Sequence, residues 1–271
     1  VRKGRELAEG EKKIAGAPLG VTLRRHERAL RDRYVKMMEE GHEGRMWYTD
    51  SGESIRFHAN DDVIRANQLA EDLAVTSSTT GVDANTGFGV KGYNQATAGV
   101  PVETGRYPAN MSPRIEEIHS AGGTAGGLKR TPFADNIARG GGFYVKPSVQ
   151  KRAVHDIWDG EAHGFINADG SPRRTGFSVA EHRWMDQQAT DAARKANERA
   201  IGGITDWTEL EGQAAAWTSA KIRAQTVKPG EEAKSFADFF EKLYFQGSRE
   251  TIAGETTGHM PEIQRAEHEI Q

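Results

Sequence analysis

Apolar residues recur at helical spacing along several long stretches of the chain, and strict alternation of apolar and polar residues is scarce. In residues 21–40, Leu23, Leu30 and Met37 follow one another every seven positions, with arginines between them. This is the stripe of an amphipathic helix. Three more helices are predicted over 61–78, 178–200 and 208–225. We therefore predict a mainly α, multi-helix globular fold with extended helical segments at both ends and little or no sheet.

The starts of these helices carry capping signals. An Asp pair opens the helix predicted over 61–78, and Asp is among the best residues for an N-cap. Ser178 with Glu181 has the spacing of a capping box, and Thr208 with Glu211 repeats it. In a capping box each of the two side chains accepts a backbone N–H that the first helical turn leaves free. These helix starts are therefore predicted from local sequence.

Glycine-rich and polar segments separate the helices. The runs HSAGGTAGG (119–127) and ARGGGFYVKP (138–147) bracket a short helical segment, LKRTPFADNIA. We interpret both runs as hinges. The alternative is a close approach of backbone to a phosphate, although neither run has the spacing of a P-loop or a dinucleotide fingerprint. The run TSSTTGVDANTGFG (76–89) predicts a polar bend between helices.

Composition narrows the class of protein. The 271-residue chain has a net charge of −3 and 36% hydrophobic residues, which is enough for a core of modest size. It has no cysteine, which excludes disulfides, cysteine-bound zinc and thiol catalysis. No run of about 18 apolar residues occurs, so we expect no membrane span. We also expect no bound cofactor.

Charge is distributed unevenly between the two ends. Residues 1–36 hold 11 Lys and Arg against 5 Asp and Glu, whereas residues 229–271 hold 4 against 9. We predict a basic helical arm over 1–42, a helical core domain over 43–225 and an acidic, aromatic interaction segment over 226–271. A basic arm is typical of contact with nucleic acid or an acidic partner, and the alternative is a solvated helix. The candidate nucleic-acid contacts are Arg24, Arg25, Arg28, Lys129 and Arg130.

An aromatic stripe marks the segment after residue 230. Its spacing predicts an amphipathic helix whose apolar face docks onto this fold or onto a partner. Within it, EKLYFQGS (241–248) also fits the cleavage pattern of a protease used to remove tags. We favour a native helix because the apolar face continues through this stretch. The candidate docking residues are Phe236, Phe239, Phe240, Leu243 and Tyr244.

One stretch, VHDIWDGEAHGF (154–165), concentrates groups suited to chemistry. Residues four apart on a helix share a face, so His155, Asp159 and His163 would offer two imidazoles and a carboxylate to one metal ion. HRWMD (182–186) repeats the spacing of one His and one Asp. The alternative is an ordinary helix showing its polar face, which the two glycines of the stretch favour.

Several stretches together resemble an uncharacterised helical domain that recurs in tailed-phage proteins. They are WYTDSGESIRFHA with LAEDLAVTSSTTGVDANTGFGVKGYN, GGLKRTPFADNI, AVHDIWDGEAHGF and DWTELEGQAAAWTSAKIRA, and the likeness covers residues 43–225. The resemblance implies a structural or interaction role in a virion, in the head or neck, for a protein made in the host cytoplasm. It implies other phage structural proteins as partners, with self-association and DNA contact as further expectations.

A more distant likeness concerns helix–hairpin–helix DNA glycosylases, which combine a glycine-bearing hairpin with a lysine or aspartate that faces the extruded base. GGLK (126–129), followed by Asp156 on the next helix, is similar in order. The likeness implies Asp156 as a catalytic carboxylate and Lys129 as a nucleophile or phosphate contact. AGGLKRTPFA lacks the tight hairpin of that family, so this alternative, a DNA-acting enzyme, ranks below the structural role.

Overall fold

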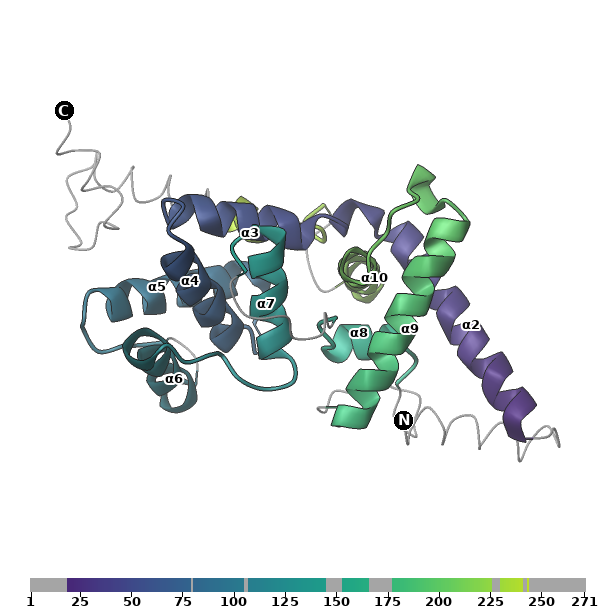
Figure 1. The fold of residues 1–271 in the computed structure, drawn as a ribbon, viewed down its shortest axis with the longest axis horizontal. Helices are drawn as coiled ribbons and strands as arrows, with labels where there is room; N and C mark the ends of the chain where they lie inside the picture. The colour runs from purple at the N-terminus through teal and green to yellow at the C-terminus, as the bar shows by residue number, and fades with distance from the viewer. Residues whose placement is uncertain are drawn as a thin grey trace. The chain divides into compact units, whose positions relative to one another are not determined.

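The computed structural model describes residues 19–78, 80–104, 107–144, 153–165, 177–225, 230–240 and 243. Within these ranges the regular secondary structure is helical with no strand, which confirms the predicted mainly α fold (Figure 1). None of these helices is both long and apolar enough to cross a membrane. The chain forms two compact units: unit 1 (Val1–Trp47 and Gln150–Ala233) and unit 2 (Tyr48–Val149 and Lys234–Gln271).

Unit 1 is arranged around its last helix, α10. Its elements are α2 (Leu19–Glu40), the 3-10 turn η1 (His42–Gly44), α8 (Ile157–Ala162), α9 (Val179–Glu198), the 3-10 turn η2 (Ile201–Gly203) and α10 (Glu209–Ala224). α10 packs against α2, α8, α9 and η1, and α2 also packs against α8 and α9. The helix that carries part of the predicted basic arm is therefore an integral part of this unit.

Small residues let the helices of unit 1 approach closely. Its core combines large side chains of α2 with alanines of α9 and α10: Tyr34, Val35, Met37, Met38, Ala192, Ala193, Ala196, Ala215, Ala216 and Ala220. Gly41, just after α2, lies directly on the α10 backbone, because a Cβ at this position would be 2.1 Å from the carbonyl oxygen of Ala215. Close packing of this kind leaves little room for larger residues at the contact.

Unit 2 surrounds α4. Its helices are α3 (Trp47–His58), α4 (Val63–Thr76), α5 (Val82–Thr97), α6 (Pro108–Ala121) and α7 (Arg130–Gly140). α4 packs against α5, α6 and α7, and every residue from Leu69 to Ser77 is buried. Because this part of α4 is covered on all sides, its acidic residues Glu71 and Asp72 are buried with it.

The predicted helices and their caps are confirmed. The four predicted helices correspond to α2, α4, α9 and α10. Both capping boxes form, with Ser178 Oγ 3.3 Å from the backbone N of Glu181 and Thr208 Oγ1 3.2 Å from that of Glu211. Asp62 caps α4 by accepting two backbone N–H groups. Local sequence therefore determines where these helices begin.

The bend predicted over 76–89 is wrong for most of its length, because α5 already begins at Val82. Two polar side chains stabilise the short connection between α4 and α5. Thr76 Oγ1 donates to Asn85 Oδ1 at 2.6 Å, and Asn85 Nδ2 donates to the carbonyl oxygen of Leu73 at 3.1 Å. A polar composition is typical of a bend. In this stretch the polar side chains instead connect two helices inside unit 2.

The aromatic segment after residue 230 contributes two rings to the interior of unit 2. Phe236 and Phe240 are buried, and the backbone N–H of Phe236 donates to Ser51 Oγ on α3 at 3.2 Å. Leu243 is exposed, and Tyr244 lies outside the described residues. The sequence left open whether the stripe docks onto this fold or onto a partner. Phe236 and Phe240 dock onto the fold itself.

A contact between helix backbones in unit 2 gives a direct test of this packing. A Cβ on Gly52 of α3 would lie 2.2 Å from the backbone N of Gly141 and 2.3 Å from the carbonyl oxygen of Ile137. We expect Gly52→Ala to destabilise the protein by about 1–3 kcal/mol, the usual cost of overpacking. The measurement is urea unfolding followed by circular dichroism.

Gly87, on α5 of the same unit, is the matched control. A Cβ there would meet nothing within 4 Å, and Ala is favoured over Gly inside a helix by about 0.5–1 kcal/mol. Gly87→Ala should therefore leave the free energy of unfolding unchanged or raise it. Equal losses in the two variants would contradict the close approach of α3 and α7.

Candidate functional site

The stretch that the sequence singled out begins a short helix in unit 1. α8 spans only Ile157–Ala162, and Asp156 is its N-cap. Asp156 Oδ1 accepts the backbone N–H groups of Trp158 at 3.0 Å and Asp159 at 3.1 Å. The predicted catalytic carboxylate therefore has a structural role at this position, and the prediction of a catalytic role stays a prediction. The second candidate of that pair, Lys129, lies in unit 2, directly before α7.

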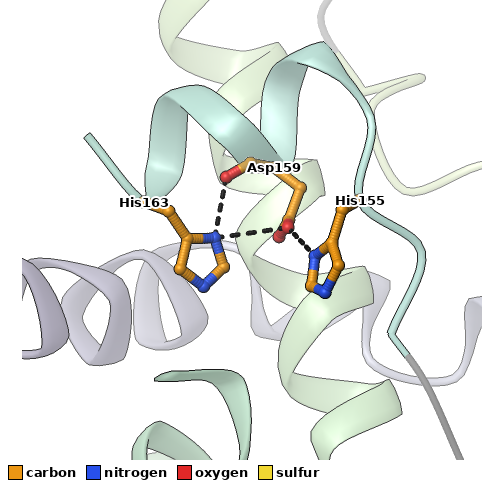
Figure 2. A group of neighbouring side chains, drawn as sticks. All are labelled: His155, Asp159 and His163. Carbon is orange, nitrogen blue, oxygen red and sulfur yellow. Dashed lines mark hydrogen bonds and ion pairs between the residues drawn. The ribbon is translucent and has the colours of Figure 1, made fainter. Parts of the chain in front are cut away.

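Two histidines of this stretch lie beside one buried carboxylate, that of Asp159 (Figure 2). His155, Asp159 and His163 are each at most 2% exposed. His155 Nδ1 lies 2.5 Å from Asp159 Oδ2. His163 Nδ1 lies 3.2 Å from the same oxygen and 2.9 Å from the backbone carbonyl oxygen of Asp159. Tyr34 of α2 donates its hydroxyl to the other carboxylate oxygen at 2.9 Å. Asp159 is thus fully hydrogen-bonded inside unit 1.

The network continues from His155 towards the surface. His155 Nε2 lies 3.0 Å from Asp186 Oδ1 on α9, and the Asp186 side chain is 24% exposed. The backbone N–H of Ala153 donates to the same oxygen at 3.2 Å. Both ring nitrogens of His155 therefore face carboxylate oxygens, which accept hydrogen bonds when ionised. This arrangement favours the imidazolium form with both N–H groups donating.

Electrostatics agrees with that assignment. Burial alone would lower the pKa of His155, but the charges and hydrogen bonds of Asp159 and Asp186 raise it to about 9. Burial would also raise the pKa of Asp159, but the charges and hydrogen bonds of His163 and His155 hold it well below its usual range. The buried pair is thus an ion pair at neutral pH, and its charges compensate each other in a medium where either alone would be costly.

The fold brings the predicted metal ligands together. The distances between their nitrogen and oxygen atoms are those of hydrogen bonds. One ligand atom from each of His155, Asp159 and His163 lies within 4.8 Å of the others. Ligand atoms of a tetrahedral zinc ion, with bonds of about 2.0–2.1 Å, are roughly 3.3 Å apart. The 2.5 Å separation of His155 Nδ1 and Asp159 Oδ2 is shorter and is that of a hydrogen bond within the ion pair. His163 Nε2 is sealed from solvent without a hydrogen-bond partner in the described residues.

A second buried acid–base pair lies in unit 2, and sequence reasoning missed it. Asp72 of α4 is completely buried, and its Oδ2 lies 2.8 Å from His119 Nε2 on α6. Its Oδ1 is sealed from solvent without a hydrogen-bond partner among the described residues. Burial raises the pKa of Asp72 to about 7, although the hydrogen bond and charge of His119 lower it. The signal was two adjacent acids in the apolar half of a helix.

The candidate nucleic-acid contacts are divided between the two units. Arg28 is an exposed residue of α2 in unit 1, and the side chains of Arg24 and Arg25 lie outside the described residues. Lys129 and Arg130 are partly buried at the start of α7 in unit 2. Contact with nucleic acid through these residues stays a prediction.

Replacing Asp159 tests the buried network. Asp159→Asn keeps the shape of the side chain and removes the charge that compensates His155. Breaking a buried ion pair by removing one partner costs about 3–5 kcal/mol, and we expect a loss of that size in the free energy of unfolding at neutral pH. Glu198→Gln, in an exposed ion pair with Arg194 of α9, should change little. Unchanged urea unfolding of Asp159→Asn would show that the network does not stabilise unit 1.

Replacing Asp72 with Asn should remove a pH dependence of stability. The pKa of Asp72 is raised by burial from 3.8 to about 7 in the folded protein. The folded state therefore binds more protons than the unfolded state between these values, so the contribution of this group is present below about pH 4 and lost as the pH rises through about 7. The quantity to measure is the melting temperature of Asp72→Asn minus that of the parent. This difference should increase by roughly 5–10 °C as the pH rises from about 4 to about 7.

The control for this measurement is Glu103→Gln, in the same unit, which removes an exposed carboxylate with a long contact of 3.9 Å to Lys91. Its melting temperature should follow that of the parent at every pH. A parallel pH profile for Asp72→Asn and the parent would mean that the buried carboxyl does not titrate in this range.

The chain was also compared with known proteins. No protein-family model, curated protein or solved structure matches it.

Proposed function

We propose that this chain is an interaction protein of a tailed-phage virion, and that it docks onto another subunit through the turn between α3 and α4. The resemblance of residues 43–225 to a phage domain supports the proposal that the protein belongs to a virion. The observation that supports docking is the exposure of large apolar side chains on both sides of one turn. Phe57 at the end of α3 is 77% exposed, and Ile64 at the start of α4 is 72% exposed.

The turn that carries these side chains is held by its own hydrogen bonds. The backbone N–H of Asp61 donates to the carbonyl oxygen of Arg56 at 3.0 Å, and Asp62 caps α4. Asn60 and Asp61 both have a positive φ, a conformation that requires such support. An apolar surface whose backbone is already ordered loses less conformational entropy on binding, which favours association.

Charged side chains border the apolar residues. Arg56 pairs with Asp61 at 2.6 Å, and Arg65 contacts Asp62 at 3.7 Å. Protein interfaces commonly have an apolar centre and a polar rim, and a few large side chains supply most of the binding energy. The chemistry of this turn therefore suits an apolar recess on another protein, lined at its edge by polar groups.

Incorporation into particles tests the proposal. The parent protein should be present at a fixed copy number in purified particles of the phage that encodes it, as measured by quantitative mass spectrometry. Phe57→Asp places a charge in the centre of the proposed interface and should reduce its copy number at least about tenfold, the effect of roughly 1.4 kcal/mol. Its fold should be unchanged, because the side chain is mostly exposed.

Val179→Asp is the matched control, because Val179 is an exposed apolar residue at the start of α9 in unit 1. Asp is well tolerated at the start of a helix, and this variant should be incorporated like the parent. Absence of the parent protein from particles would contradict the virion assignment. Normal incorporation of Phe57→Asp would contradict docking through the turn.

A further inference from the structure

Lys221 of α10 is a buried lysine in unit 1. It is 5% exposed, and every other Lys or Arg whose side chain the structure describes is more exposed. Transferring an ammonium group out of water is costly unless acceptors replace the lost water. The surroundings of its amine therefore decide its chemistry.

The amine of Lys221 has an aromatic neighbour in place of acceptors. Nζ lies 3.6 Å from the ring centroid of Trp217, one helical turn earlier. Within the described part of the chain no hydrogen bond or ion pair involves this amine.

Two carboxylates lie within electrostatic range of the amine. Burial lowers the pKa of Lys221 to about 8, although the charges of Asp156 and Glu232 raise it. Compared with the ordinary value of 10.5, this increases the neutral, nucleophilic fraction at pH 7 by roughly two orders of magnitude. A ligand for this amine therefore needs an electrophilic group that reacts with the amine and a planar ring that stacks on the indole. It should carry no negative charge, because two carboxylates lie nearby.

We propose that Lys221 is a nucleophilic amine that condenses with small neutral aromatic aldehydes beside Trp217. Desolvated lysines are the amines that proteins use to form Schiff bases with carbonyl compounds. The charges of Asp156 and Glu232 disfavour a phosphate or carboxylate ligand, and the indole ring offers a surface on which a planar ring can stack. This activity resides in unit 1 and is independent of the docking turn of unit 2.

The reaction balances without an oxidant or a reductant. The lone pair of the neutral Nζ attacks the carbonyl carbon, and the C=O bond becomes a C–O single bond in a carbinolamine. The nitrogen then loses a proton, the hydroxyl group takes one up and leaves as water, and a C=N bond forms. Solvent supplies and removes these protons.

The test uses pyridoxal as a neutral aromatic aldehyde and the full chain. Borohydride added after short incubations reduces the imine to a stable amine, and peptide mass spectrometry locates it. Lys221 should be labelled about tenfold faster than the exposed Lys36 and Lys91, because its larger neutral fraction outweighs its lower basicity. The labelling rate should rise with pH and level off above about 8. In denaturing urea this selectivity should disappear.

Three variants sharpen the result. Lys221→Arg should remove the fast site and leave labelling of Lys36 unchanged. Asp156→Asn retains an N-capping side chain for α8 but removes a charge that raises the pKa of Lys221, so the pH midpoint of labelling should shift downward. Asp206→Asn, whose side chain is 86% exposed, should leave the midpoint unchanged.

A rate at Lys221 equal to or below those of the exposed lysines in the parent protein would overturn the proposal. A pH midpoint that does not differ between the parent and Asp156→Asn would also contradict it. If Lys221→Arg proves unfolded by circular dichroism, the comparison of native and urea-unfolded parent still decides the question.

Discussion

The arrangement of unit 1 depends on the hydrogen bonds and ion pairs of one buried carboxylate, that of Asp159. It accepts a hydrogen bond from Tyr34 of α2 and is paired with His155 and His163, which flank α8. A six-residue helix gains little stability from its own backbone hydrogen bonds. The network therefore fixes α8 against α2, and His155 extends the connection to Asp186 of α9. The polar interior that first suggests chemistry thus also determines how these helices pack.

The two units bury acidic groups in opposite ways. Asp159 is surrounded by donors on both oxygens, and the pKa of its carboxyl is lowered. Asp72 has His119 on one oxygen and a sealed second oxygen, and its pKa is raised. Lys221 is a third case, a buried cation beside an aromatic ring. The cost of burying charge is met by compensation in the first case and reduced by a shift towards the neutral form in the other two.

Features that depend on neighbours in the chain could be predicted, and features that depend on distant residues could not. The four-residue spacing of His155, Asp159 and His163 correctly places them together, and the capping boxes form where local sequence predicts them. Tyr34 comes from 125 residues away, and no local pattern indicates it. Likewise the sequence shows two adjacent acids, Glu71 and Asp72, among apolar residues, but their burial arises because α5, α6 and α7 cover α4.

The glycine contact between α3 and α7 restricts the alignment of these two helices. A Cβ on Gly140 would lie 2.2 Å from the carbonyl oxygen of Tyr48, and one on Gly141 would lie 2.4 Å from that of Gly52. Sliding α3 by one residue would bring Ser51 or Glu53 to a point where only main-chain atoms fit, whereas α7 ends in a run of three glycines, 140–142. The restriction therefore comes mainly from α3, and an insertion or deletion beside Gly52 would place a side chain in this contact even if every apolar residue were retained.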